Sequence, residues 1–209
     1  MSKTLNVCFL GASEVGKSSL ISSFQNSYFD EGQIYLPTIE NKYSKLYTYN
    51  KQLFNINTYD TSGSLECSCI VPSTIKQCEA FVIVYSLTDR NSCDSITMYK
   101  EMIKNCFKYL KGGDNVPIIL VGNKVDGDNY KNLAFTETEI QELSKYINLP
   151  YIEASSKDIQ SVQSIFNLLI DTINFKEKQL KKQQLRYKKQ LRNENNRNFF
   201  QKIFDLKLK

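Results

Sequence analysis

The chain has 209 residues, enough for one domain with a full hydrophobic core and an appended segment. It contains no histidine, which excludes histidine-based catalytic triads, histidine metal ligands and an imidazole general base. The net charge of +5 is unevenly spread: residues 176–209 carry 12 Lys or Arg against 3 Asp or Glu, leaving 15 against 19 upstream, so the body is at −4 and the tail at +9.

A phosphate-binding loop is the first motif along the chain. Residues 5–10 predict a buried strand, and Leu20, Ile21 and Phe24 fit one face of the following helix. Between them, residues 11–18 read GASEVGKS, the P-loop pattern: its glycines let backbone amides surround phosphates, its lysine supplies a positive charge, and its last hydroxyl suits Mg²⁺. We therefore expect nucleotide binding by Ser13, Glu14, Val15, Gly16, Lys17, Ser18 and Ser19.

The later apolar runs predict the fold class. Strands are expected at residues 43–49, 52–59, 80–87, 116–121 and 150–154, with helices in most of the gaps. Asn50 and Lys51 separate two runs too closely for a crossover, so those strands should form an antiparallel hairpin. Thr136 and Glu139 form a capping box, and residues 162–173 have clear helical periodicity. We predict an α/β fold: a six-stranded, mostly parallel sheet with one antiparallel edge strand and helices on both faces, followed by a basic helical C-terminal extension.

Two polar motifs follow predicted strands, at the sheet edge where such folds bind ligands. Asp60-Thr61-Ser62-Gly63 offers a carboxylate that can hold Mg²⁺ through water and a glycine amide for a γ-phosphate, although a polar β-turn is the alternative. Asn123-Lys124-Val125-Asp126 offers a carboxylate that can accept two hydrogen bonds from guanine. Adenine lacks that paired donor edge, so we expect guanine to be preferred.

Together with Ala154-Ser155-Ser156-Lys157, these motifs resemble the signature of Ras-superfamily small GTPases over roughly residues 4–175. Residues 37–41, PTIEN, resemble the switch I effector segment of the Ras family and are most like Rheb. The resemblance implies a P-loop small G domain that binds GTP or GDP with Mg²⁺. It implies metal contacts from Ser18, Thr38 and Asp60, nucleotide contacts from Phe29, Tyr35, Pro37, Thr38, Gly63, Asn123, Lys124, Asp126, Ser155, Ser156 and Lys157, and catalytic roles for Lys17, Thr38, Gly63 and Ser64.

Several positions depart from the family pattern. Ser64 stands where the Ras family usually has a glutamine that orients the attacking water, so we expect slow intrinsic GTP hydrolysis. Ser13 and Glu14 replace glycines of Ras and can obstruct an activator's arginine, and we expect Glu14 to face solvent. The chain is thus expected to be a signalling switch whose GTP form recruits effectors through switches I and II, with an exchange factor and a GTPase activator as regulators. The alternatives are a GTP-locked binding module with negligible hydrolysis and, more distantly, an ATP-using nucleotide kinase.

The predicted domains are a G domain at 1–175 and a basic, helical or flexible tail at 176–209. Phe199, Phe200, Ile203 and Phe204 have helical spacing, so the tail can contact an anionic membrane, a partner or solvent. No nucleic-acid motif accompanies the basic residues, and we expect a monomer that binds no nucleic acid.

The cysteines and the chain ends bear on location. The six cysteines, at positions 8, 67, 69, 78, 93 and 106, have no paired metal spacing and favour reduced thiols, with a redox or metal role for Cys67 and Cys69 as the alternative. No secretory signal, membrane-spanning run, myristoylation glycine or prenylation cysteine is evident. We expect a cytoplasmic protein, peripheral on the cytosolic face of a membrane if its tail binds lipid.

Overall fold

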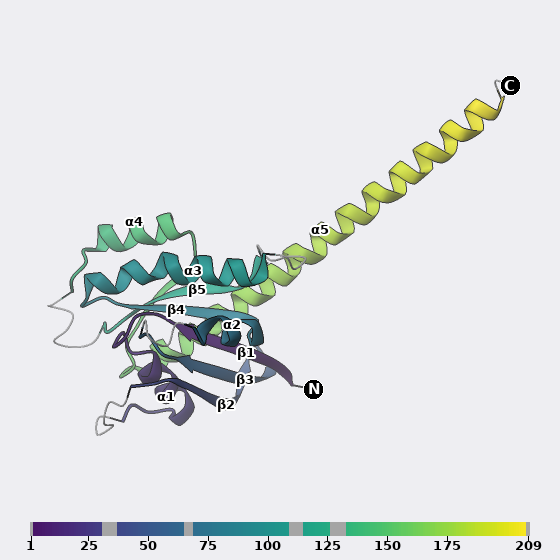
Figure 1. Cartoon of the computed structure of the whole chain (residues 1–209). Helices are drawn as coiled ribbons and strands as arrows, with labels where there is room; N and C mark the ends of the chain where they lie inside the picture. Colours follow the sequence, from purple (N-terminus) through teal and green to yellow (C-terminus); the bar gives the residue numbers. More distant parts are fainter. Residues whose placement is uncertain (1, 31–36, 65–68, 109–114, 126–132, 208–209) are drawn as a thin grey trace. The chain divides into compact units, whose positions relative to one another are not determined.

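The computed structural model describes residues 2–30, 37–64, 69–108, 115–125 and 133–207 (Figure 1). The chain divides into two units, Met1–Ile173 and Asn174–Lys209. The elements follow in this order: β1 (Lys3–Leu10), α1 (Lys17–Asn26), β2 (Glu40–Tyr49), β3 (Gln52–Thr61), α2 (Val71–Gln77), β4 (Ala80–Ser86), the 3₁₀ helix η2 (Arg90–Cys93), α3 (Asp94–Phe107), β5 (Ile118–Asn123), α4 (Glu137–Ile147), β6 (Tyr151–Ala154) and α5 (Ile159–Lys207).

The first unit contains one six-stranded sheet in the order β2-β3-β1-β4-β5-β6. Within the described ranges, β2 and β3 are the only strands that pair antiparallel, and the other neighbouring strands pair parallel. The predicted fold class is therefore confirmed. Parallel pairing also brings the carboxyl ends of β1, β3, β5 and β6 to one edge of the sheet, which is where ligands bind in open α/β sheets.

The β2–β3 hairpin turns through Asn50 and Lys51, both with a left-handed backbone, φ 48° and 63°. Two consecutive positive φ values match the tight turn whose twist suits a hairpin, and asparagine tolerates this region better than most residues. The second strand begins at Glu40, three residues before the predicted run, because Glu40 pairs with Thr61 in the antiparallel ladder. Pairing extends the strand over polar residues that apolar periodicity could not detect.

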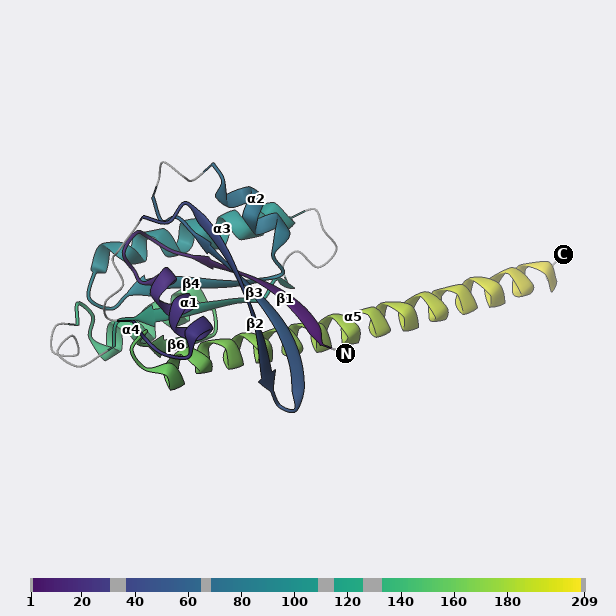
Figure 2. The same cartoon turned by 90° about the horizontal axis from the view of Figure 1, so that it is seen from below.

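Two hydrophobic clusters cover the two faces of the sheet. Every residue of β4 is buried, and its side chains alternate: Val82 and Val84 join the cluster of α1 and the start of α5, whereas Phe81, Ile83 and Tyr85 join that of α2, α3 and α4. Figures 1 and 2 show helices on both faces of the sheet. The predicted 162–173 periodicity corresponds to buried residues of α5, among them Phe166, stacked on Phe24 with ring centroids 3.5 Å apart.

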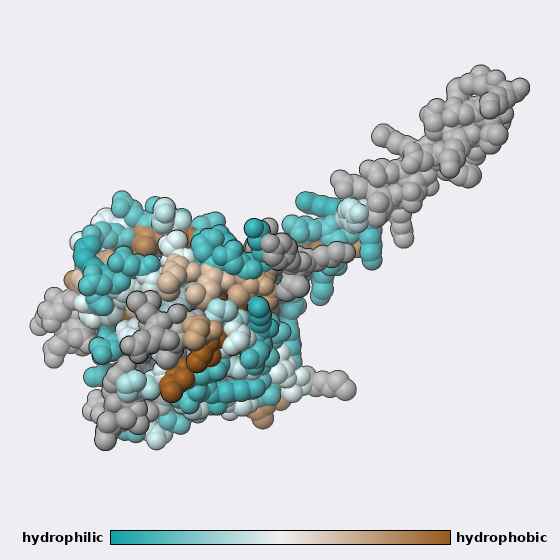
Figure 3. Space-filling model, viewed as in Figure 1, coloured by the Kyte–Doolittle hydropathy of each residue, from teal (hydrophilic) through white to brown (hydrophobic). Residues whose placement is uncertain are grey.

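In the second unit, the structure describes residues 174–207, which belong to α5. Leu185 and Tyr187 are exposed, in keeping with the thin apolar stripe of the sequence. Among the residues that the structure describes, no helix is both long and apolar enough to cross a membrane. Hydrophilic residues predominate on the face of the first unit seen in Figure 3, interrupted by a small, strongly hydrophobic patch.

Candidate nucleotide-binding site

A cavity of about 560 Å³ opens at the carboxyl edge of the sheet, and most of the predicted site residues line it. This volume lies within the range of ordinary ligand pockets. Segments from the P-loop to the end of β6 meet here because their parallel strands end at the same edge. The lining residues are Ser13, Glu14, Gly16, Lys17, Ser18, Ser19, Phe29, Pro37, Thr38, Thr61, Ser62, Gly63, Ser64, Asn123, Lys124, Ser156 and Lys157.

The P-loop joins β1 to the N-terminus of α1. A Cβ on Gly16, whose φ is 92°, would lie 2.2 Å from Asn123 Nδ2, so only glycine fits. Gly16 is the N-cap of α1, and no side chain in the described part of the chain caps that helix. Its first amides are therefore available to an anion, which the helix dipole also favours.

Lys17 is held across this loop. Its buried ammonium donates to the carbonyl oxygens of Gly11 at 2.9 Å and Ala12 at 2.8 Å. Burial lowers the pKa of Lys17 to about 8, and the charges of Asp60 and Cys8 act in the opposite direction. A phosphate in the cavity would supply the negative charge that this desolvated ammonium requires.

Three oxygen-bearing side chains meet beside Lys17. The hydroxyl oxygens of Ser18 and Thr38 are 3.0 Å apart, and Thr38 Oγ1 donates to Asp60 Oδ2 at 3.5 Å. Burial raises the pKa of Asp60, while its hydrogen bond from Ser18, the charge of Lys17 and the bond from Thr38 lower it. Within the described ranges, Asp60 Oδ1 is buried without a hydrogen-bond partner.

This oxygen set fits Mg²⁺. It offers two hydroxyls and one carboxylate, hard ligands of the kind the ion prefers, and one oxygen of that carboxylate is buried without a hydrogen-bond partner among the described residues. Ser18 and Thr38 would hold the ion, with Asp60 acting through water. When bound, the ion would neutralise charge on the phosphates.

The loop after β3 lies against the P-loop. A Cβ on Gly63 would be 2.3 Å from Ala12 C and Ser13 N, so glycine alone permits this approach. Ser62 donates its backbone amide to the carbonyl oxygen of Ile39 at 3.1 Å, which ties the loop to switch I. Ser64 lines the cavity, and its amide donates to Ser62 Oγ at 3.1 Å. The two segments expected to sense a γ-phosphate are thus connected to each other and to the P-loop.

The far end of the cavity holds the residues predicted to contact guanine. Asn123 donates through Nδ2 to the carbonyl oxygen of Val15 at 2.8 Å, and its Oδ1 is buried without a partner among the described residues. The Lys157 ammonium lies 5.8 Å from the centre of the Phe29 ring. Ser155 is buried and accepts a hydrogen bond from the amide of Lys157 at 3.1 Å. Ser155 therefore shapes the loop that presents Ser156 and Lys157 to the cavity.

Some predicted residues are placed differently or fall outside the described ranges. Val15, Asp60 and Ser155 are buried and are not among the residues that line the cavity. Tyr35 and Asp126 lie outside the described residues. Thr61 and Ser62 line the cavity although no nucleotide contact was predicted for them. Because both lie inside the Asp60–Gly63 motif, the sequence could have predicted their place at the site. Glu14 is exposed at the rim, with φ 61°.

The fold and the cavity together define an α/β nucleotide-binding protein of the P-loop class. Comparison with known proteins identifies the family: the Ras family profile matches residues 6–175. The chain is 31% identical to the Ras-like protein rasW of Dictyostelium discoideum over 83% of this chain and 76% of that protein. It is 33% identical to rasC of the same organism, over 83% and 88%, and 34% identical to the Ras-like protein 1 of Saccharomyces cerevisiae, over 78% and 50%.

The chain belongs to the Ras family and is a small GTPase. Such proteins are switches that bind GTP or GDP with Mg²⁺ and act through effectors, exchange factors and GTPase activators. The predicted family is confirmed.

Proposed function

We propose that this protein is a guanine-nucleotide switch that hydrolyses GTP slowly and therefore stays in its GTP form for long periods. The observation that carries the proposal is the position of Ser64 in the cavity wall, directly after Gly63. Phosphoryl transfer depends on positioning and electrostatics, and a short hydroxyl cannot reach an attacking water as a glutamine amide does. Thr38 and Gly63 would bind the γ-phosphate side of GTP and order switches I and II for an effector.

The partners follow from the same proposal. Residues 37–41, the segment most like Rheb, would contact effectors, together with switch II. The protein would act as a monomer in the cytoplasm, peripheral on a membrane through its basic tail. Glu14 is exposed and lines the cavity, which favours a second candidate, a GTP-locked module, because a side chain at this position can obstruct an activator's arginine.

Single-turnover hydrolysis of bound GTP tests the proposal. The native chain should hydrolyse slowly, and Ser64→Gln should accelerate the reaction by at least about tenfold. Ser44→Gln, at an exposed position on β2, is the matched control and should change nothing. Rapid turnover by the native chain would show that another group positions the water. Absence of turnover in every variant, with activators present, would favour the GTP-locked module.

A further inference from the structure

A second cavity, of about 460 Å³, lies between α4 and the edge strand β6, and we call it the edge cavity. It shares no lining residue with the nucleotide cavity. Leu133, Phe135, Ile140 and Tyr151 give it apolar walls. The other lining residues are polar or charged: Glu137, Gln141, Ser144, Lys145 and Glu153. A volume of several hundred cubic ångströms is typical of small-ligand sites.

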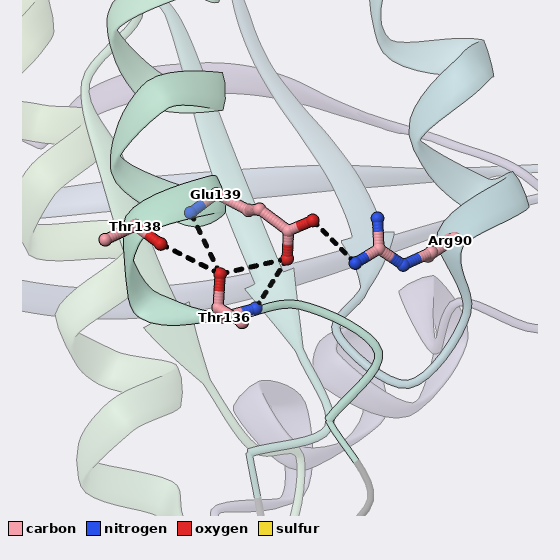
Figure 4. Close-up of polar contacts among 4 residues, drawn as sticks. All are labelled: Arg90, Thr136, Thr138 and Glu139. Carbon is pink, nitrogen blue, oxygen red and sulfur yellow. Dashed lines mark hydrogen bonds and ion pairs between the residues drawn. The ribbon is translucent and has the colours of Figure 1, made fainter.

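The Phe135 wall is fixed from both sides. The ring of buried Tyr85 meets Phe135 edge to face with centroids 5.9 Å apart, and the Arg90 guanidinium lies 5.1 Å from the centre of the Phe135 ring. Arg90 in turn donates to Glu139 at 2.7 Å, and Glu139 completes the capping box of α4 with Thr136 (Figure 4). The wall is therefore built before any ligand arrives.

The polar groups of the edge cavity favour a cation. Among the described lining residues, Glu137 and Glu153 contribute two carboxylates and Lys145 contributes one ammonium. Tyr151 donates its hydroxyl to Glu153 Oε1 at 3.2 Å and itself receives a hydrogen bond from Tyr85 at 3.2 Å. This chain of hydroxyls holds the Glu153 carboxylate at the cavity, beside an aromatic wall.

We propose that the edge cavity binds an organic cation, an ammonium or guanidinium group carried on an apolar body. The body packs against Phe135, Ile140 and Tyr151, and the cationic group pairs with Glu137 and Glu153. Glu137 and Glu153 are both exposed to solvent, so each pairing adds selectivity rather than large affinity.

Ligand binding in the edge cavity should change the environment of Gly122, which precedes Asn123 of the nucleotide cavity. A Cβ on Gly122 would lie 2.6 Å from the Tyr151 hydroxyl oxygen, so that hydroxyl rests on the backbone of β5 just before Asn123. Any displacement of Tyr151 by a ligand changes the surroundings of the Gly122 amide. Gly122 is therefore a reporter that a ligand elsewhere on the surface would not move.

The test is titration of the full chain with 2-phenylethylammonium, followed by amide NMR shifts. We expect saturable shifts at Ile140, Tyr151 and Gly122 at millimolar ligand, and affinity about threefold higher than for 2-phenylethanol, its neutral isostere. Absence of saturable shifts, shifts that leave these residues unaffected, equal binding of the alcohol, or tighter binding of phenylacetate would overturn the proposal.

Different variants test the role of the carboxylates and the role of the cavity space. Glu137→Gln with Glu153→Gln should abolish the preference for the ammonium, while Glu142→Gln, an exposed α4 residue outside the lining, should keep it. Ser144→Phe places a ring in the cavity and should block both the ammonium and the alcohol. A double glutamine variant that keeps the native preference, or unchanged binding in Ser144→Phe, would contradict the proposal even if the other variants behaved as expected.

Discussion

Glu14 occupies a backbone conformation that costs most side chains energy. Its φ is 61°, and its side chain is exposed, so no contact compensates for the strain through burial. Glu14→Gly should raise the free energy of unfolding by about 0.5–1 kcal/mol. This is the backbone strain that glycine relieves, minus the cost of glycine's greater conformational entropy in the unfolded chain. Glu14→Gln keeps the Cβ and should leave stability unchanged. Urea unfolding at one fixed nucleotide concentration measures both; a less stable glycine variant would contradict the strain argument.

Glu139 makes the free energy of unfolding depend on pH. The backbone amide of Thr136 is the main cause that lowers the pKa of Glu139 from 4.5 to about 2, followed by Arg90 and the Thr136 hydroxyl. A depressed carboxyl pKa gives stability that is present above pH 4.5 and is lost as pH falls toward 2.

We therefore expect Glu139→Gln to lower the melting temperature at pH 6. Below about pH 4.5, the melting temperature of this variant should fall less steeply with decreasing pH than that of the native chain. Thermal unfolding from pH 6 downward measures this, with Glu142→Gln as the matched control that retains the native slope. A Glu139→Gln variant with the native slope would show that other carboxyls carry the acid dependence.

At the level of elements, the N-terminus of α4 depends on one hydroxyl. Thr136 Oγ1 accepts the amide of Glu139 at 3.3 Å, and the Glu139 carboxylate accepts the amide of Thr136 at 2.8 Å. Thr136→Ala should reduce the free energy of unfolding by about 1 kcal/mol. Thr138→Ala removes a hydroxyl from the same turn, one that shares a hydrogen bond with Thr136 Oγ1 at 3.0 Å and caps no backbone amide among the described residues, and should cost less. Equal losses in chemical denaturation would argue against the cap.

Short-range patterns predicted the elements well because burial and turn chemistry are local. The hairpin at Asn50 and the capping box at Thr136 both need only neighbouring residues, and both are present. The start of β2 was placed late because Glu40 enters the sheet by pairing with Thr61, a distant residue. Where tertiary pairing decides an element's boundary, hydrophobic periodicity lacks the necessary information.

The nucleotide cavity was predictable in composition but less so in arrangement. Its motifs each follow a strand, and parallel strands bring them together. The sequence alone could not show that Lys17 donates hydrogen bonds to carbonyl oxygens of its own loop, or that Lys157 lines the cavity whereas Ser155 does not. The edge cavity was not predicted at all, since Leu133 and Glu153 belong to no short motif and meet only through packing.

At the scale of the whole molecule, charge is divided between the two parts of the chain. The tail from residue 176 carries +9 and the body −4, so an anionic surface should attract the tail and repel the rest. Lys181, Lys182, Lys188 and Lys189 lie in α5, and all four are exposed. Near an anionic leaflet each such charge contributes about 1 kcal/mol.

We therefore predict that the full chain sediments with phosphatidylserine-containing vesicles and not with phosphatidylcholine alone, and that salt releases it, because the attraction is screened. Replacing these four lysines by glutamine should weaken binding by more than about 100-fold. The control replaces Lys3, Lys51, Lys76 and Lys108 of the body, which removes the same charge outside the tail and should leave binding nearly unchanged. Equal loss in both quadruple variants would mean that total charge, not the tail, governs membrane attraction.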